Sequence, residues 1–297
     1  MPKGVRTNFN YHVPFNTEET LQLLHKYGKL AKIIAGGTDL IPKIKAGTEE
    51  FDEIISLKNV KELATYRFDE NGTLHIGSMV RLAELEKDLR VKEAFPALWE
   101  GIHSMANTQI RNRGTITGNI CNAVPSCDTA PALIVYDASV VIRNIADERV
   151  VPITEFFTGV CQTCLAPDEL VTEILVPARN PDSSSVYYKY AVRKALDLAM
   201  VGVASNVSVK NGVAENVKLA LGAVAIVPKR AAHAEALLQG RPLTKELIDQ
   251  AAEIASQEDC KPISDIRATA DYRREMVRIH VRDALNLAAG IKSEVMV

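Results

Sequence analysis

The chain has 297 residues, enough for one large domain or two ordinary ones, and 47% of them are hydrophobic, as in average globular proteins. Its formal net charge is −2 and its basic residues form no long run, which excludes the usual basic nucleic-acid-binding surface. No apolar stretch reaches the length of a membrane span, and residues 1–15 lack the apolar segment of a secretory signal. Five cysteines, an odd number, favour a reducing compartment, so we expect a cytoplasmic protein.

The first half of the chain mixes helical and strand patterns. Asn16 opens a helix with the spacing of a capping box, and Gly28 supplies the residue that ends it. The apolar run Ala31–Ala35 predicts a strand that ends at Gly36-Gly37. The same signals predict strands over Glu53–Leu57, Thr73–Gly77 and Ser139–Ile145, and short helices over Lys58–Ala64, Arg81–Asp88 and Phe95–Met105. This order indicates an α+β or α/β region.

The pattern breaks at Arg179–Ser185, where a proline and a serine run separate two periodic regions, and this predicts a domain boundary. Beyond it, Asn211-Gly212 separates the strand patterns Val201–Val209 and Val213–Val224, which predicts a β-hairpin. Helical patterns follow over Lys229–Leu238, Lys245–Ser256 and Thr269–Ala289. We therefore expect the C-terminal third to be a small sheet followed by helices.

The segment Ile33–Ile41 (IIAGGTDLI) has the composition of a phosphate-binding loop. A strand leads into Gly36-Gly37, two residues that can adopt positive φ, and Thr38 and Asp39 add short polar groups. Successive backbone N–H groups in such a turn can point at a diphosphate. A Gly-Gly pair after a strand is more often a plain turn, so this loop alone leaves both interpretations open.

A second loop of similar chemistry is predicted over Arg113–Ala123 (RGTITGNICNA). Thr115 and Thr117 offer hydroxyl groups, Gly118 allows close approach of the backbone, and Asn119 can donate and accept hydrogen bonds. Neither loop contains the G-x-G-x-x-G of a Rossmann fold or the G-K-[ST] of a Walker loop. The two loops together therefore predict a phosphate cradle of another type.

Three blocks of sequence resemble the flavin subunits of the molybdenum hydroxylases, the xanthine dehydrogenase and carbon monoxide dehydrogenase family. They read AGGTDL at 35–40, QIRNRGTITGNICNAVPSCDTAPAL at 109–133 and YYKYAVRKALDLAMVGVA at 187–204. The resemblance covers essentially the whole chain and implies an α+β fold. Residues 1–182 would form a PCMH-type FAD-binding domain of two α+β lobes. Residues 183–297 would form a C-terminal domain of a small antiparallel sheet and a helical bundle.

The resemblance also implies the residues that contact FAD. The first loop and Met105 would lie against the pyrophosphate and the flavin ring, and the remaining contacts come from the second loop and from two later segments. In full, they are Ile33, Ile34, Ala35, Gly36, Gly37, Thr38, Asp39, Leu40, Met105, Thr115, Ile116, Thr117, Gly118, Asn119, Asn122, Asp128, Val171 and Lys189.

Some of these residues also have plainer interpretations. Lys189 could be a solvated lysine beside a strand, Asp128 a helix N-cap before Thr129, and Met105 an ordinary core residue. The family usually has a glycine where this chain has Thr117, so Thr117 can serve the loop only if its φ is negative.

Four cysteines raise the question of a metal site. Cys161 and Cys164 have ligand spacing, with Cys121 and Cys127 upstream. A branch of the family similar to 4-hydroxybenzoyl-CoA reductase carries an iron–sulfur cluster in an inserted loop, and this chain has no such insertion. We therefore expect buried or idle thiols and no metal. Neither flavin loop contains a histidine, so we expect noncovalent FAD.

The resemblance implies a subunit that passes electrons from iron–sulfur clusters through FAD to NAD or another acceptor. Its partners would be a large molybdopterin-binding subunit and a small [2Fe-2S] subunit, in a dimer of heterotrimers. No catalytic acid, base or nucleophile is expected in this chain. The substrate is expected to be a purine such as xanthine, with nicotinate, carbon monoxide, aldehydes or aromatic acyl-CoA as alternatives. The rival hypotheses are a self-contained PCMH-type oxidase or reductase, and a degenerate scaffold subunit that has lost FAD.

Overall fold

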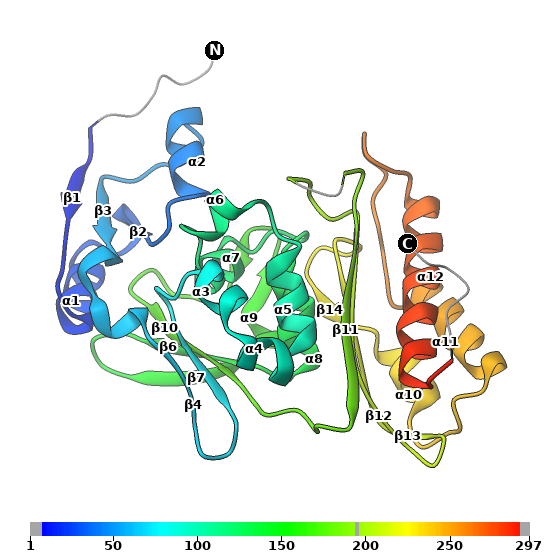
Figure 1. Ribbon diagram of the computed structural model, residues 1–297. Coiled ribbons are helices and arrows are strands. Elements are labelled where there is room, and N and C mark those ends of the chain that lie inside the picture. The colour runs from blue at the N-terminus through cyan, green and yellow to red at the C-terminus, as the bar shows by residue number, and fades with distance from the viewer. Residues whose placement is uncertain (1–7, 194–195, 292–297) are drawn as a thin grey trace.

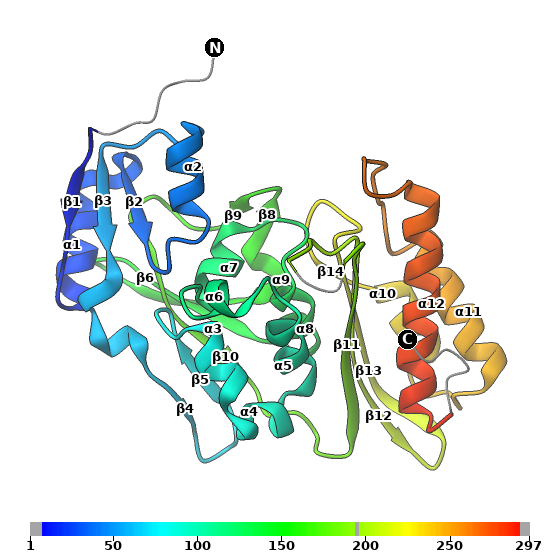
Figure 2. The same cartoon turned by 45° about the horizontal axis from the view of Figure 1, so that its top comes forward.

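The computed structural model describes residues 8–193 and 196–291, which form three sheets with their helices (Figure 1). The first residues of the N-terminal segment, and residues 194–195 of the block at 187–204, lie outside the described residues. The three units follow one another along the chain and across the molecule in Figures 1 and 2. This arrangement confirms the expected α+β fold.

The first lobe is a three-stranded parallel sheet of order β1-β3-β2. Helix α1 connects β1 to β2, as a parallel connection requires. The predicted N-cap is confirmed, because the Asn16 side chain accepts from the Glu19 backbone N–H at 2.8 Å. The Glu19 carboxylate accepts from the Phe15 N–H, whereas a capping box would use the Asn16 N–H. Gly28 ends the helix with a φ of 48°. The elements are β1 (Asn10–His12), α1 (Thr17–Tyr27), η1 (Gly28–Leu30), β2 (Ala31–Ile34), α2 (Leu40–Ala46), β3 (Glu53–Ser56), η2 (Leu57–Asn59) and η3 (Lys61–Ala64).

The second lobe contains a five-stranded antiparallel sheet of order β4-β5-β10-β6-β7. Seven short helices accompany it, and a two-stranded ribbon pairs β8 with β9. The strands are β4 (Tyr66–Phe68), β5 (Leu74–Gly77), β6 (Ser139–Arg143), β7 (Glu148–Pro152), β8 (Phe157–Gly159), β9 (Gln162–Thr163) and β10 (Leu170–Val176). The helices are α3 (Leu82–Lys87), α4 (Leu89–Ala94), α5 (Pro96–His103), α6 (Thr108–Arg111), α7 (Ile116–Asn122), α8 (Thr129–Val135) and α9 (Ile153–Phe156).

The third unit is an antiparallel sheet of order β11-β12-β13-β14 followed by helices. The predicted hairpin is confirmed, with Asn211 and Gly212 both at positive φ (52° and 79°) between β12 and β13. The elements are β11 (Ser183–Tyr190), β12 (Val201–Lys210), β13 (Val213–Gly222), β14 (Lys229–Arg230), α10 (Ala232–Leu238), α11 (Lys245–Gln257) and α12 (Ala270–Ala288).

This sheet lies between two layers of helices (Figure 1). Helices α5 and α8 contact one face and α12 contacts the other. Tyr187, Ala204 and Ala220 accordingly belong to the same buried cluster as the core of the second lobe. A separate cluster joins the opposite face, with Val203 and Leu221, to the C-terminal helices. The sheet is therefore buried on both faces.

Several predicted elements need correction. The helix expected over Lys58–Ala64 is two 3-10 turns, because Val60 between them has a non-helical φ and ψ of −81° and 82°. The helix expected over Lys229–Leu238 begins only at Ala232, because Lys229 and Arg230 pair with β13. The strands expected at Thr73–Gly77 and Ser139–Ile145 are confirmed in slightly shorter form.

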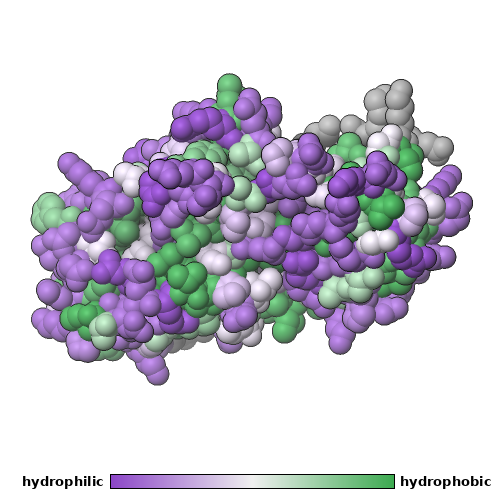
Figure 3. All heavy atoms as spheres, turned by 90° about the horizontal axis from the view of Figure 1, so that it is seen from below, coloured by the Kyte–Doolittle hydropathy of each residue, from purple (hydrophilic) through white to green (hydrophobic). Residues whose placement is uncertain are grey.

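The face of the molecule drawn in Figure 3 is mostly polar. In Figure 3, which shows one face, hydrophilic residues predominate and hydrophobic residues form small groups among them. Within the described residues, no helix has the length and apolar character needed to cross a bilayer.

Candidate FAD-binding cavity

The first glycine loop has the tight geometry that its sequence predicts. Gly37 has a φ of 75°, a conformation that side chains disfavour. A Cβ atom on Gly36 would lie 2.1 Å from the Arg113 carbonyl oxygen, so only glycine fits there. The first loop thus packs backbone against backbone on Arg113 and Gly114, at the start of the second predicted loop. From Gly37 the chain turns into helix α2, whose N-terminus lies at the cavity.

The second predicted loop is mostly a helix, which corrects the expectation. Residues 116–122 form α7, and the Thr115 hydroxyl caps it by accepting from the Gly118 N–H at 2.9 Å. Thr117 lies in the first turn and is not among the residues with positive φ. It therefore meets the requirement for a negative φ that a threonine has at this position. A helical position needs no glycine, which explains how this chain accommodates threonine there. A helix N-terminus presents N–H groups without partners inside the helix and favours anions.

A cavity of about 610 Å³ opens where the two lobes and the third unit meet. This is within the usual range of ligand sites. All but two of the predicted contact residues line it, and the exceptions are Ile116 and Lys189. The lining set comprises Ile33, Ile34, Ala35, Gly36, Gly37, Thr38, Asp39, Leu40, Met105, Thr115, Thr117, Gly118, Asn119, Asn122, Asp128 and Val171. The fold therefore brings together segments that are more than 130 residues apart.

Ile116 and Lys189 have other positions. The Ile116 side chain is fully buried in the core of the second lobe. Lys189 extends from β11 and donates to the Asp128 carboxylate at 2.8 Å and to the Ser104 carbonyl oxygen at 3.1 Å. Only about a tenth of either charged side chain is exposed. Lys189 is therefore a buried, paired lysine, not a solvated one, and it lies behind the cavity wall.

Asp128 faces the cavity and is held from the third unit. It occupies the N-cap position of α8, as the plainer interpretation expected, but its side chain makes no capping hydrogen bond to that helix. It accepts instead from the Tyr187 hydroxyl at 2.9 Å and from Lys189. Burial raises the pKa of Asp128, and the charge of Lys189 opposes that rise. A buried carboxylate of this kind is stable only while its donors remain in place.

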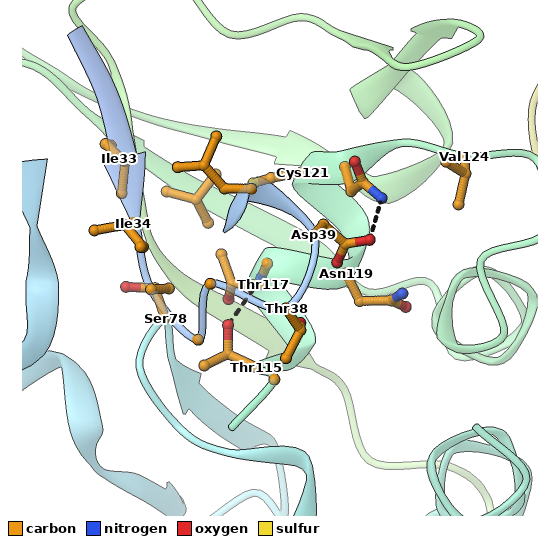
Figure 4. Close-up of a pocket in the computed structure, with 18 of the residues that line it drawn as sticks. Ile33, Ile34, Thr38, Asp39, Ser78, Thr115, Thr117, Asn119, Cys121 and Val124 are labelled. Carbon is orange, nitrogen blue, oxygen red and sulfur yellow. Dashed lines mark hydrogen bonds between the residues drawn. The ribbon is translucent and has the colours of Figure 1, made fainter. Parts of the chain in front are cut away.

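A polar network spans one edge of the cavity between α2 and α7. The Asn122 amide donates to Asp39 at 2.9 Å, and Lys43 donates to the Asn122 oxygen at 2.8 Å. Lys43 also pairs with Glu49 at 3.5 Å. Burial raises the pKa of Asp39, with Lys43 opposing. This network ties the N-terminal part of α2 to the C-terminal end of α7, and Figure 4 draws the hydrogen bond to Asp39 as a dashed line.

Five residues with hydroxyl groups line the described cavity wall, namely Thr38, Ser78, Thr115, Thr117 and Ser126, and Figure 4 labels the first four. The hydroxyl oxygens of Ser78 and Thr117 are buried and have no hydrogen-bond partner among the described residues. A buried hydroxyl group without a partner costs about 1–3 kcal/mol, so such groups point to a ligand. Ser78 was missed by the sequence analysis. Its only signal is its place directly after the strand predicted at Thr73–Gly77.

The cysteines occupy different environments. Cys121 lines the cavity, Cys127 is buried with its thiol 2.9 Å from the Asn119 side-chain oxygen, and Cys161 is exposed. Burial raises the pKa of Cys121 and of Cys127 to about 12, so both are neutral thiols at neutral pH. Within residues 8–193 and 196–291, no group of three or more histidines, cysteines or carboxylates could hold a metal ion.

Comparison with known families identifies the chain. The model of the FAD-binding domain in molybdopterin dehydrogenase matches residues 7–179, and that of the CO dehydrogenase flavoprotein C-terminal domain matches residues 186–288. The chain belongs to the FAD-binding subunits of the molybdopterin dehydrogenases. It is therefore an FAD-dependent oxidoreductase subunit, as the resemblance implied.

Relatives that are named for different substrates align with nearly the whole chain. The putative xanthine dehydrogenase FAD-binding subunit of Escherichia coli K12 is 31% identical over 95% of this chain and 96% of its own. The carbon monoxide dehydrogenase medium chain of Hydrogenophaga pseudoflava is 33% identical over 94% and 96%. The nicotinate dehydrogenase FAD-subunit of Eubacterium barkeri is 32% identical over 91% and 93%. The solved carbon monoxide dehydrogenase of H. pseudoflava superposes with a TM-score of 0.91, at 33% identity, over 98% of this chain and 99% of that one.

The cavity of this FAD-binding subunit fits the cofactor. The Gly36-Gly37 turn leaves no room for a side chain, and it lies beside two helix N-termini that suit a diphosphate. The unpartnered hydroxyls of Ser78 and Thr117 supply donors at the same wall. Apolar side chains of Ile33, Leu40 and other residues offer surface for planar rings.

Proposed function

We propose that the chain is the electron-exit subunit of a cytoplasmic molybdenum hydroxylase that acts on a purine such as xanthine. Its partners are a large molybdopterin-binding subunit and a small [2Fe-2S] subunit, assembled as a dimer of heterotrimers. FAD, when bound, supplies the redox chemistry that takes electrons from the clusters and gives them to NAD or another acceptor. The residues of this chain bind the cofactor, orient it and exclude water from it.

The observation that carries this proposal is the composition of the cavity. The glycine cradle, the two helix N-termini and the hydroxyl groups all suit one cofactor. Among the described residues that line the cavity there is no histidine, and Cys121 is held as a neutral thiol. The carboxylates Asp39 and Asp128 of this wall accept hydrogen bonds from Asn122 and Lys189, so the wall suits binding and orienting a redox cofactor.

Two observations support the proposed partners and substrate. The relative from H. pseudoflava is the medium chain of a carbon monoxide dehydrogenase, and 94% of this chain aligns with it. The xanthine dehydrogenase relative aligns over 95% of the chain, and the second cavity segment NICNAVPS resembles that type. Relatives that act on nicotinate and carbon monoxide are equally similar, so the substrate must be tested on the complex.

The test is to purify the tagged chain from its native host and to identify its partners by mass spectrometry. We expect equimolar large and small subunits and a mass of two heterotrimers. Anaerobic addition of xanthine should then bleach the flavin absorbance of the complex, whereas the isolated chain should not respond. Bleaching by nicotinate or carbon monoxide in place of xanthine would reassign the substrate. Xanthine-driven bleaching of the isolated chain would favour the self-contained oxidase.

A further inference from the structure

The loop of residues 104–106 forms part of the cavity wall and is held at each of its carbonyl groups. Met105 and Ala106 line the cavity, and Ala106 has a φ of 48°, which is unusual for a residue with a side chain. The Ser104 carbonyl accepts from Lys189 at 3.1 Å, and the Ala106 carbonyl from the Leu196 N–H at 3.3 Å. The Met105 carbonyl accepts from Arg111 at 2.8 Å. The backbone of this loop is thus fixed from both sides of the molecule.

Of the three donors, Lys189 and Leu196 belong to the third unit, whereas Arg111 belongs to the second lobe. The Arg111 side chain is itself held by other residues. Its Nε and Nη2 atoms donate to the two carboxylate oxygens of Glu86 at 2.8 and 3.0 Å, which leaves Nη1 for the Met105 carbonyl. His103 contacts the same carboxylate at 2.8 Å. The Arg111 residue is 8% exposed and does not line the cavity. A planar guanidinium held along one edge by a carboxylate cannot swing away, so its remaining donor points in one direction.

We propose that the Glu86–Arg111 pair is a positioning device for the bound cofactor, acting through the Met105 carbonyl. The proposal rests on the placement of FAD in this cavity. A methionine side chain is flexible, so its contact with a ligand is defined only if its backbone is fixed. Arg111 fixes that backbone next to Ala106, whose positive φ would relax if the loop were released. The pair therefore sets how the Met105 side chain meets FAD, without touching FAD itself.

The test compares three single variants in the isolated full-length chain. Arg111→Lys keeps the positive charge but cannot pair with Glu86 and reach the carbonyl at the same time. Glu86→Gln keeps the shape and removes the charge that locks Arg111. Arg230→Lys is the matched control, because Arg230 makes the same two-point contact with Glu235, at 2.7 and 2.9 Å, and neither residue lines the cavity.

We measure the FAD dissociation constant by flavin fluorescence, the position and shape of the flavin absorption bands, and the melting temperature of the FAD-free chain. Arg111→Lys and Glu86→Gln should each weaken FAD binding about tenfold, the loss expected when one charge-assisted hydrogen bond fails, and should shift the flavin bands. The control should keep the wild-type dissociation constant and spectrum. In a Met105→Ala background, Arg111→Lys should cause no further spectral shift.

Three results would overturn the proposal. One is unchanged FAD affinity and spectrum in both variants, with only the melting temperature lowered. Another is a spectral shift that persists undiminished in the Met105→Ala background. The third is failure of both variants to fold while the control folds, since the pair would then be structural. A wild-type chain that binds no FAD would instead contradict the proposed function.

Discussion

Gly36 and Gly37 show that two neighbouring glycines serve different purposes. Gly36 allows the first loop to touch the backbone at Arg113, where a Cβ would overlap the carbonyl oxygen. Gly37 adopts a positive φ, and a Cβ there would also meet the side chains of Ile41 and Ile34 at 2.9 and 3.2 Å. The first requirement is space and the second is backbone conformation. Both shape the cradle at the helix N-termini.

Replacing Gly37 with valine should therefore abolish FAD binding while leaving the chain folded. Valine carries a β-branched side chain that resists the required φ and enters the space around Ile41. The flavin-to-protein ratio after purification measures the effect, with circular dichroism as the test of folding.

Gly240→Val is the matched control. Gly240 has a similar φ of 72° with no atom near its Cβ position, so it should suffer a similar backbone strain of about 1–2 kcal/mol and keep full flavin. Full flavin occupancy in Gly37→Val would show that the first loop is a plain turn.

At the scale of single residues, the sequence predicted cavity residues that belong to a short local motif. The glycine pair lines the cavity, and so do Thr115 and Thr117–Asn119, so each motif contributes neighbouring residues to the same wall. Ser78 and Arg111 could not be assigned in the same way. Ser78 reaches the cavity only because β5 ends there, and Arg111 acts through a carbonyl group that any residue would provide. Lys189 was predicted as a contact of the cofactor, and the structure places it behind Asp128, to which it donates. The sequence alone gives no sign of this pairing, because the two residues are far apart along the chain.

At the scale of elements, α7 shows how a short helix can be mistaken for a loop. Threonine, glycine and asparagine are common in turns, and their presence outweighed the helical signal. The Thr115 hydroxyl, however, caps the helix by binding the Gly118 N–H. The three-residue edge strands β1 and β4 were missed, and so were the longer strands β10 and β11. The helices α1 and α11 were predicted well because their caps are local in sequence.

Thr115→Ala should fray the first turn of α7 at the cavity wall. We expect a loss of about 1 kcal/mol in the free energy of unfolding, as for other N-cap removals, together with weaker FAD binding. Thr244→Ala is the control, because Thr244 caps α11 by the same contact with the Leu247 N–H and lies outside the cavity lining. It should lose similar stability and bind FAD normally. Urea unfolding and flavin titration measure the two effects, and equal FAD affinity in both variants would contradict the role assigned to α7.

At the scale of the whole molecule, the cavity forms where three units meet, and none of them contains it alone. The first lobe contributes the glycine cradle, the second contributes α7 and Asp128, and the third unit holds Asp128 through Lys189. The local sequence patterns predicted many of the helices and strands, but they did not predict that the three units enclose one cavity. That expectation came from the family resemblance. The boundary at residues 182 and 183 stays a prediction.

The cofactor should be released intact when the protein is denatured. The described cavity lining has no histidine, and its one cysteine, Cys121, is a neutral thiol with a pKa of about 12. The described lining therefore offers no histidine and no thiolate for covalent attachment of the flavin ring at neutral pH. Acid precipitation should therefore leave free FAD in the supernatant, which chromatography identifies. Flavin that stays with the precipitate, or FMN in the supernatant, would contradict noncovalent FAD.

The contact between Lys189 and Asp128 has a consequence for how the chain unfolds. If the C-terminal sheet separated first, Asp128 would lose both of its side-chain donors, and the α5 and α8 surfaces that pack on Tyr187 and Ala204 would meet water. Partial detachment therefore carries most of the cost of complete denaturation. We expect calorimetry to show one cooperative transition, and residues 1–182 expressed alone to aggregate. The chain would then be a single thermodynamic unit, although two family models describe it.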